Sequence, residues 1–282
     1  MEPFEQQAGQ GLARFNIKLW QDQESGLTAG FTGRDGGIST SPYHSLNLAF
    51  HVGDSAEAVI CNRRLLADSL GFCLEDWTCG EQVHSSHIGV INEAWRGAGS
   101  TSRETAFQDT DGLLSNVPGV LLTSFYADCV PLYFWDPVHE AVGLAHAGWK
   151  GTVASIAEKM IGRMSELYGS RPGEIRCAIG PSIGMCCYEV DDKVMNPVQD
   201  LDLPAPGNNM SPDMLFYDKG NGKYMLNLKE INRHIMIKAG ILADHIECTS
   251  WCTSCRNDLF FSYRKDGGVT GRMASWIGLR KR

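Results

Sequence analysis

Three apolar runs in the middle third of the chain constrain its fold most. They cover 120–126, 130–135 and 141–145, and each is rich in β-branched, aromatic or other apolar residues, which predicts buried strands. A strand of the same character is predicted at 82–91. A helical pattern follows at 149–168 and ends at Gly169. This alternation, without repeats or a clear linker, predicts an α/β fold.

Other segments extend the same pattern. Apolar residues recur at helical spacing over 56–71, with Asp54 or Ser55 as N-cap, and a second helix is predicted over 227–239. Further predicted elements are a short strand at 177–179 before a Gly/Pro turn, an irregular loop at 200–213 that is also a candidate domain boundary, a strand at 245–248, and a closing hairpin of 260–264 with 272–277 around Asp266-Gly267-Gly268.

Composition narrows the class of protein. Hydrophobic residues make up 43% and charged residues 21% of the 282 residues, as in ordinary soluble globular proteins. The net charge of −8 argues against a nucleic-acid partner, which requires a basic surface. The start has no secretory signal and no apolar run is long enough to span a membrane. We therefore expect a cytoplasmic protein whose ten cysteines are thiols.

Imidazole and thiol groups stand at the ends of the predicted strands. They occur in Gln82-Val83-His84, in Ala127-Asp128-Cys129, and at His146 within 145–151. Two imidazoles and one thiol are the ligand set of a three-coordinate metal site with one open position. Asp128 is available as an acid or as a partner that orients a ligand.

Alternative interpretations remain for these residues. A single histidine or cysteine is more often a packing or hydrogen-bonded residue than a ligand. His87 competes with His84, because only one of the two can point into the site from a strand. A metal-free hydrolase with Cys129 as nucleophile and His146 as base would use the same groups.

The motifs taken together closely resemble the YlmD/YfiH family, whose members are variously called laccase-domain proteins, polyphenol oxidases, peptidoglycan editing factors and purine nucleoside phosphorylases. The resemblance runs from about Phe31 to Ile277. It is carried by Asn47, Arg63, Gln82-Val83-His84, Ala127-Asp128-Cys129-Val130-Pro131, Ala145-His146-Ala147-Gly148-Trp149, Gly180-Pro181-Ser182-Ile183, Cys187-Tyr188-Glu189-Val190, Cys252-Thr253 and Phe261-Ser262-Tyr263-Arg264.

This resemblance implies one domain over 1–282, a layered α-β-β-α sandwich with mixed sheets, with a disordered or loosely packed start at 1–12. It also implies a zinc ion held by His84, Cys129 and His146, and so favours His84 over His87. Lys150 departs from the family, which more often has arginine after Gly-Trp. A lysine keeps the positive charge but loses bidentate anion binding.

The family's names imply different reactions. A multicopper laccase needs paired histidine motifs, whereas this chain has eight histidines and no such pair outside 84/87. Zinc with an open position generates hydroxide or polarises a bound atom. Our leading hypothesis is a zinc-dependent purine nucleoside phosphorylase for adenosine, inosine and methylthioadenosine, with adenosine deaminase side activity. The alternatives are an amide hydrolase editing peptidoglycan precursors, a polyphenol oxidase with copper, and a binding protein without activity.

Such a phosphorylase requires groups for phosphate and nucleoside. The candidates for phosphate are Arg63, Lys150 and Arg264, with backbone N–H groups of 33–37. Asn47 is a candidate for ribose or base. Each also has an ordinary interpretation, as a solvated charge or ion pair for the basic residues and as a turn residue for Asn47.

The remaining cysteines carry a weaker pattern. Cys252 and Cys255, with Cys248 upstream, have the spacing of half a zinc ribbon, but no second pair follows. The adjacent Cys186 and Cys187 are poor partners for one metal ion. We interpret both as packing residues, with Cys187 near the pocket.

Overall fold

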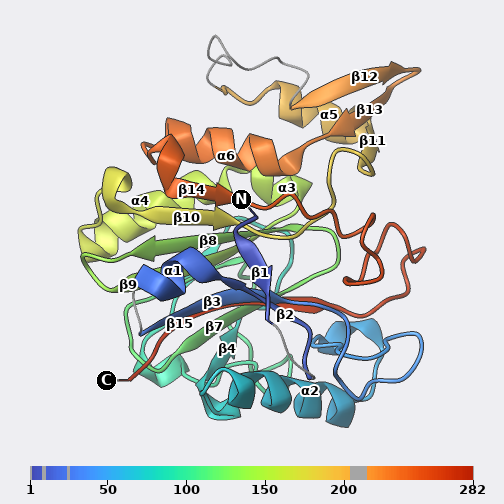
Figure 1. The fold of residues 1–282 in the computed structure, drawn as a ribbon. Coiled ribbons are helices and arrows are strands. Elements are labelled where there is room, and N and C mark those ends of the chain that lie inside the picture. Colours follow the sequence, from blue (N-terminus) through green and yellow to red (C-terminus); the bar gives the residue numbers. More distant parts are fainter. Residues whose placement is uncertain (1, 8–10, 24–25, 204–214, 282) are drawn as a thin grey trace.

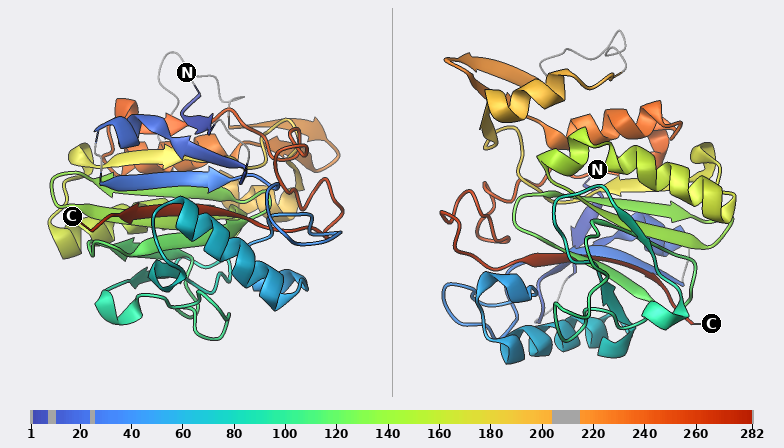
Figure 2. Two further views of the ribbon diagram at one scale, coloured as in Figure 1. Left: turned by 60° about the horizontal axis from the view of Figure 1, so that its bottom comes forward. Right: turned by 180° about the vertical axis from the view of Figure 1, so that it is seen from behind.

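The computed structural model describes all residues except 1, 8–10, 24–25, 204–214 and 282. Two mixed sheets lie face to face, with helices over both outer faces (Figures 1 and 2). The predicted layered α-β-β-α sandwich with mixed sheets is therefore confirmed.

The first sheet is built around the C-terminal strand. Its order is β1 (Phe4–Gln6), β2 (Arg14–Ile17), β3 (Leu27–Thr32), β15 (Met273–Leu279), β7 (Leu121–Tyr126) and β4 (Trp77–Cys79). The strand β15 pairs antiparallel with both β3 and β7, and β4 pairs parallel with β7. Segments from the start, middle and end of the chain therefore form one sheet.

The second sheet contains the predicted central strands. Its order is β14 (Ile246–Cys248), β10 (Arg176–Ile179), β8 (Val130–Asp136), β9 (Ala141–Ala147), β6 (Gly112–Ser115) and β5 (Ile88–Val90). Every residue of β8 and β9 is buried, because the first sheet covers one face and helices cover the other. Hence these strands have apolar residues on both faces.

Helices complete the layers. The helix α2 (Ala56–Ser69) lies over the first sheet, whereas α3 (Trp149–Val153), α4 (Ile156–Tyr168) and α6 (Leu228–Lys238) lie over the second (Figure 1). A small sheet of β11 (Glu189–Asp191), β13 (Lys223–Leu226) and β12 (Phe216–Gly220) lies beside α5 (Asp192–Gln199). The remaining helical elements are α1 (Lys18–Gln23) and the 3-10 turns η1 (Phe50–Val52), η2 (Leu74–Asp76), η3 (Glu93–Trp95), η4 (Pro172–Glu174) and η6 (Ala243–His245).

Three apolar cores fill the spaces between the four layers. Along β8, Val130, Leu132 and Phe134 face the helix-side core, while Tyr133 and Trp135 face the core between the sheets. This two-residue period is that of an extended strand. On β15, Trp276 packs in the third core with residues of α2. The layer order thus follows from which strand face each apolar residue occupies.

Several predicted elements are confirmed. Ser55 caps α2 by accepting from the N–H of Ala58, and Gly169 ends α4 with φ 74°. The helix α6 begins after Asn227, whose side chain accepts from the N–H of Glu230. The strands at 177–179 and 245–248 correspond to β10 and β14.

Other predictions were wrong. The segment 82–91 is extended only at β5, and the predicted 149–168 helix is interrupted at Ser155, whose φ is 53°. The predicted closing hairpin does not form, because β15 pairs with β3 and β7 while 260–264 is a loop. Buried Phe260 and Phe261 anchor that loop in the core between the sheets.

Two predictions concern segments described only in part. For the start at 1–12, predicted as disordered or loosely packed, the structure instead has β1 paired with β2 and Phe4 buried, with 8–10 outside the described residues. The predicted loop 200–213 lies outside the described residues from 204 onward.

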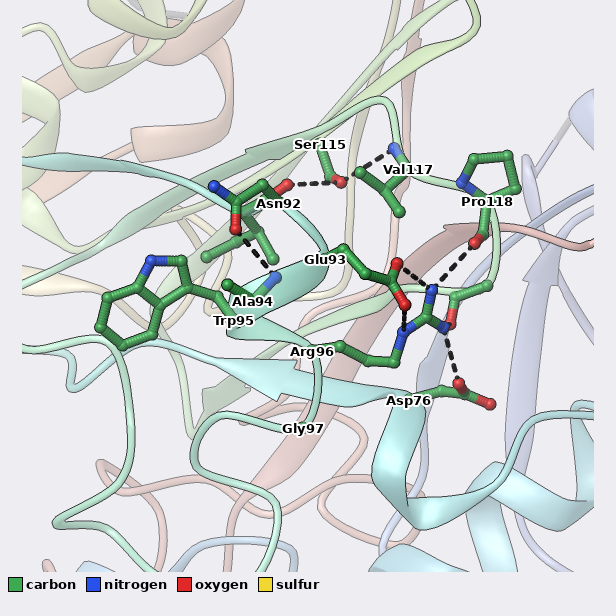
Figure 3. A network of polar contacts seen from close by, with 12 residues as sticks. Asp76, Asn92, Glu93, Ala94, Trp95, Arg96, Gly97, Ser115, Val117 and Pro118 are labelled. Atoms are coloured by element: carbon green, nitrogen blue, oxygen red, sulfur yellow. Dashed lines mark hydrogen bonds and ion pairs between the residues drawn. The ribbon is translucent and has the colours of Figure 1, made fainter.

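A polar network around Arg96 joins the edge of the first sheet to the turn before β7 (Figure 3). The guanidinium pairs with Asp76 at 2.9 Å and with Glu93, and it donates to the carbonyls of Pro118 and Gly119. These contacts hold η2, η3 and the 118–119 turn together, and none of the residues in the network lines either of the cavities described below.

Within the described part of the chain, no helix combines the length and apolar character required to cross a bilayer.

Candidate metal centre

Two histidines and one cysteine from separate segments converge at the ends of the strands. His84 lies in the loop between β4 and β5, Cys129 lies between β7 and β8, and His146 is on β9. Their ligand atoms lie within 4.8 Å of one another. The rings of His84 and His146 meet edge to face, with centroids 4.9 Å apart. The structure therefore brings together the three residues that the sequence predicts as ligands, and His87 lies outside the group.

Asp111, immediately before β6, organises this group and was missed by sequence reasoning. Its Oδ1 lies 2.8 Å from His146 Nδ1 and accepts from the N–H of His84 at 3.1 Å. Its Oδ2 accepts from the N–H groups of Val83 and Ser85. One buried carboxylate thus orients a ring and holds the loop that carries His84. A carboxylate on the second nitrogen of a histidine is a common partner of metal-binding histidines.

Two residues in these loops have left-handed backbone conformations. The φ of His84 is 62° and that of Asp128 is 89°, values uncommon outside glycine. Asp128 accepts from Thr253 Oγ1 at 2.6 Å and from the N–H of Arg264 at 2.7 Å. Its carboxylate therefore joins three loops beside Cys129.

Charges on neighbouring side chains shift the pKa values of two residues in the cluster. Burial by itself lowers the pKa of His146, but the Cys129 sulfur and the Asp111 carboxylate outweigh it and raise this pKa to about 9. Burial likewise raises the pKa of Cys129, yet His146 and His84 lower it to about 6. A divalent metal requires a thiolate and neutral imidazole groups, so binding of an ion here would also displace the proton that the raised pKa places on His146.

Gly148 shows that the centre tolerates little additional bulk. A Cβ atom built on this glycine would lie 3.1 Å from Cys129 Sγ and 3.1 Å from His84 Cδ2. Glycine thus leaves the space between the ligand atoms free. Together with the donor set, this space fits a zinc or copper ion bound through two nitrogens and one sulfur.

The centre opens into a cavity of about 510 Å³. Aromatic side chains form much of its wall, and two arginines also line it. The lining residues are His51, Gln82, His84, Phe125, Ala127, Asp128, Cys129, His146, Trp149, Ile183, Tyr188, Tyr263, Arg264 and Arg272. The volume is within the range of small-molecule sites.

A second cavity of about 320 Å³ adjoins the first. The two share His51, Gln82, His84 and Phe125. Two of these shared residues are bonded to each other. The side-chain amide of Gln82 donates to the backbone carbonyl of Phe125 at 2.9 Å and accepts from its N–H at 2.8 Å. His84 therefore stands where the two cavities meet.

Comparison with known proteins now adds to this geometry. A family model described as "Multi-copper polyphenol oxidoreductase laccase" matches residues 28–280. The chain belongs to this laccase family. The predicted resemblance to YlmD/YfiH proteins is confirmed by relatives and by solved structures.

The relatives within the laccase family carry a different activity in their names. "Purine nucleoside phosphorylase YlmD" of Geobacillus stearothermophilus is 44% identical over 91% of this chain and 92% of its own length. The Bacillus subtilis protein of the same name is 41% identical over 90% and 89%. The crystal structure of YlmD from Geobacillus stearothermophilus has a TM-score of 0.91 at 42% identity and covers both chains completely. That of the Bacillus licheniformis hypothetical protein YfiH has a TM-score of 0.89 at 44% identity, covering 95% and 96%.

The residues that the sequence predicts to bind substrate lie in different parts of the structure. Arg264 lines the larger cavity, and its guanidinium lies over the Tyr188 ring at 5.4 Å. Arg63 lines the smaller cavity but is 1% exposed and donates to the carbonyls of Leu48, Gly99 and Ser100.

The other substrate candidates lie outside the walls of both cavities. Lys150 is exposed, with its ammonium 5.9 Å from the Trp149 ring centroid. Asn47 is fully buried, bonds to Ala49 and Asp54, and accepts from the N–H of Arg272 at 2.9 Å, contacts of a turn-stabilising residue. In the segment 33–37, the N–H groups of Gly36 and Gly37 donate to Ser45 Oγ.

Sequence reasoning also missed Arg272 and His51. Arg272, just before β15, lines the larger cavity, and His51 lines both. Desolvation within the cavity walls, followed by the charges of Arg272 and Arg103, lowers the pKa of His51 to about 4, so its ring is neutral at pH 7. The sequence offered one signal, a single basic residue directly before an apolar terminal strand.

The adjacent pair interpreted as packing residues forms a second group with the two cysteines that have the spacing of half a zinc ribbon. Cys186, Cys187, Cys252 and Cys255 have sulfur atoms within 4.8 Å of one another. The structure thus places both thiols of the adjacent pair in one group, which their interpretation as poor partners for one metal ion did not anticipate. Cys248 lies outside this group.

Proposed function

We propose that this protein is a zinc-dependent purine nucleoside phosphorylase with adenosine deaminase side activity. One observation carries the proposal. His84 belongs both to the His/Cys/His group and to the shared wall of the two cavities. The residues that would hold an ion therefore lie in the wall of the larger cavity, beside the space in which a nucleoside and a phosphate would meet. The names of the YlmD relatives support the same reaction.

The larger cavity suits a purine nucleoside. Trp149, Tyr188 and Tyr263 supply aromatic surface against which a purine ring stacks. Arg264 and Arg272 supply positive charge on the same cavity wall, and we assign them to phosphate or ribose oxygens. The side chain of Asn47 accepts a hydrogen bond from the backbone N–H of Arg272. We therefore assign Asn47 a role in positioning Arg272.

The reaction transfers ribose from purine to phosphate. A phosphate oxygen bonds to C1′ as the C1′–N9 bond breaks, and the purine leaves with the bonding electron pair and takes up a proton. Arg264 and Arg272 hold the phosphate, while neutral His51 offers a hydrogen bond from the wall shared by the two cavities. A zinc ion held by His84, Cys129 and His146 would supply a Lewis acid and, for deamination, a nucleophilic water.

The hydrogen bonds of Asp128 and Arg63 restrict the roles that the sequence suggests for these two residues. Both carboxylate oxygens of Asp128 accept hydrogen bonds from Thr253 and Arg264, so we assign Asp128 to positioning rather than proton transfer. Arg63 is committed to three backbone carbonyls. We retain it as the positive wall of the smaller cavity.

Copper-dependent oxidation of phenols is the second candidate, and the family description favours it. Among the described residues, however, the candidate metal groups are one mixed His/Cys group and one all-cysteine group. Reduction of dioxygen by multicopper enzymes uses several histidine-rich copper sites, and these groups do not provide them. Amide hydrolysis of peptidoglycan precursors would use the same ion and its water.

The test measures products with purified protein of known metal content. Given inosine or adenosine with phosphate, the zinc-loaded protein should release free base and ribose 1-phosphate, and adenosine alone should yield ammonia and inosine. His84→Ala should lose both activities, while Cys248→Ser should retain them. Absence of ribose 1-phosphate from zinc-loaded protein contradicts the proposal. Phenol oxidation by copper-loaded protein, or amino-acid release from a muropeptide, would then identify an alternative.

A further inference from the structure

The four-cysteine group joins two loops, one of which also contributes Ile183 and Tyr188 to the lining of the larger cavity. Cys186 and Cys187 follow β10, and Cys252 and Cys255 follow β14. The Sγ atom of Cys255 lies 3.5 Å from that of Cys186 and 3.4 Å from that of Cys187. A disulfide requires about 2.05 Å between its sulfurs, so these are four free thiols, as all ten cysteines are.

The backbone around the group is arranged to present sulfur atoms. The two loops meet at the bridge between Ser182 and Cys252, where the N–H of Thr253 donates to the carbonyl of Ser182. The chain then turns on both sides, with Cys187 N–H bonded to Gly184 and Arg256 N–H bonded to Cys252. The N–H of Gly184 also donates to Cys252 Sγ at 3.2 Å. An amide directed at sulfur stabilises a thiolate.

We propose that Cys186, Cys187, Cys252 and Cys255 bind a second metal ion, a structural zinc with four sulfur ligands. Tetrahedral zinc with bonds of about 2.3 Å places its sulfur ligands about 3.8 Å apart, close to the two separations found here. Binding converts four thiols to thiolates and releases four protons. All four positions on the ion are then occupied by protein, which leaves none for substrate.

This ion would fasten one wall of the larger cavity. Ile183 and Tyr188 flank the cysteine pair and line the cavity. The N–H of Ile183 donates to the carbonyl of Asp128, and Thr253, beside Cys252, donates to the Asp128 carboxylate. Cross-linking the two loops through one ion thus restrains residues that touch the nucleoside in the proposed function. The zinc site itself rests on the cysteines and is independent of that function.

Metal content tests the site directly. Protein purified under reducing, oxygen-free conditions should contain about two zinc ions per chain. Cys255→Ser and Cys186→Ser, at the two exposed positions, should each lower this to about one, as should Cys129→Ala at the other centre. Cys248→Ser is the matched control, because its thiol lies in the same stretch of chain but outside the group, and it should retain both ions. One ion in the wild type, unaffected by Cys255→Ser, would overturn the proposal.

Cobalt provides a readout that does not depend on activity. In Cys129→Ala, where the first centre is disabled, Co²⁺ should give the sulfur-to-cobalt charge-transfer absorption of a tetrathiolate, and adding Cys255→Ser should abolish it. Circular dichroism and the melting temperature of the cobalt-free variants show that they are folded. If Cys129→Ala gives no such absorption, the zinc proposal fails. It also fails if intact mass reveals that the cysteines form a disulfide under reducing conditions and thereby exclude the metal.

Discussion

The two sulfur-containing clusters differ in how they are held and in what they face. Strand ends and one buried carboxylate hold His84, Cys129 and His146, and the cluster opens into a cavity. Two loops hold the four cysteines, two of which are exposed on the protein surface. The difference resembles that between catalytic metal sites, which keep a position open, and structural sites, which are closed by protein ligands. The composition of a cluster therefore says less about its role than the space beside it.

Removing one sulfur ligand from each cluster is the strongest test of the difference between them. Cys129→Ala should lower kcat/KM for nucleoside phosphorolysis by about a thousandfold, equivalent to about 4 kcal/mol, because the ion is lost from the open cluster. Cys255→Ser should lower the melting temperature and affect kcat/KM less. Steady-state kinetics and thermal melts on both variants provide the measurement. A larger kinetic loss in Cys255→Ser than in Cys129→Ala would reverse the assignment.

Asp111 tests whether the open cluster depends on its carboxylate. Asp111→Asn retains the shape but weakens the contact to His146 and the N–H bonds of the His84 loop. We expect metal affinity to fall about 10- to 100-fold, measured by competition with a chromophoric chelator. Ser85→Ala removes one of the neutral contacts to the same carboxylate and should have a smaller effect. Unchanged affinity in Asp111→Asn would mean that the ligands are preorganised without it.

A substitution at an arginine of the larger cavity distinguishes an effect on phosphate binding from an effect on metal content. Arg272→Met removes charge from the wall but leaves both clusters intact, so KM for phosphate should rise about tenfold with zinc content unchanged. Lys150→Met, whose side chain is exposed and does not line either cavity, is the matched control and should leave KM near the wild-type value. An equal rise in both variants would indicate a general electrostatic effect.

A substitution at Arg96 should have the smallest effect, and it serves as a control for the metal content and activity of both clusters. Arg96→Met breaks the network in Figure 3 and should lower the free energy of unfolding by about 1 to 2 kcal/mol. Denaturant titration measures this loss. Metal content and kcat/KM should stay at wild-type values, since no residue of the network lines either cavity or belongs to either cluster. Loss of either ion in this variant would show that metal content reports on overall stability.

The sequence predicted the members of the His/Cys/His group better than the residues around them. Cys129 and His146 were recognisable because each stands at the edge of an apolar strand, whereas His84 was preferred over His87 through the resemblance to the YlmD/YfiH family. Asp111 was missed because its partners His84 and His146 lie far from it along the chain, and nothing local distinguishes it from a turn residue. The 272–277 strand was predicted correctly, but its partner was wrong. Pairing with β3 and β7 is a long-range contact that local alternation does not encode.

By itself the sequence determined the α/β class, most of the element types and the donor atoms, because these depend on local periodicity and on side-chain chemistry. Only the tertiary structure decided which donors meet. It grouped Cys186 and Cys187 with Cys252 and Cys255, placed Asp111 under His146, and separated Asn47 and Lys150 from the cavity walls. The physical reason is that sheet order and loop conformation, including the left-handed turns at His84 and Asp128, set distances between segments remote in the chain. The open cluster and the four-thiol cluster are both products of that arrangement.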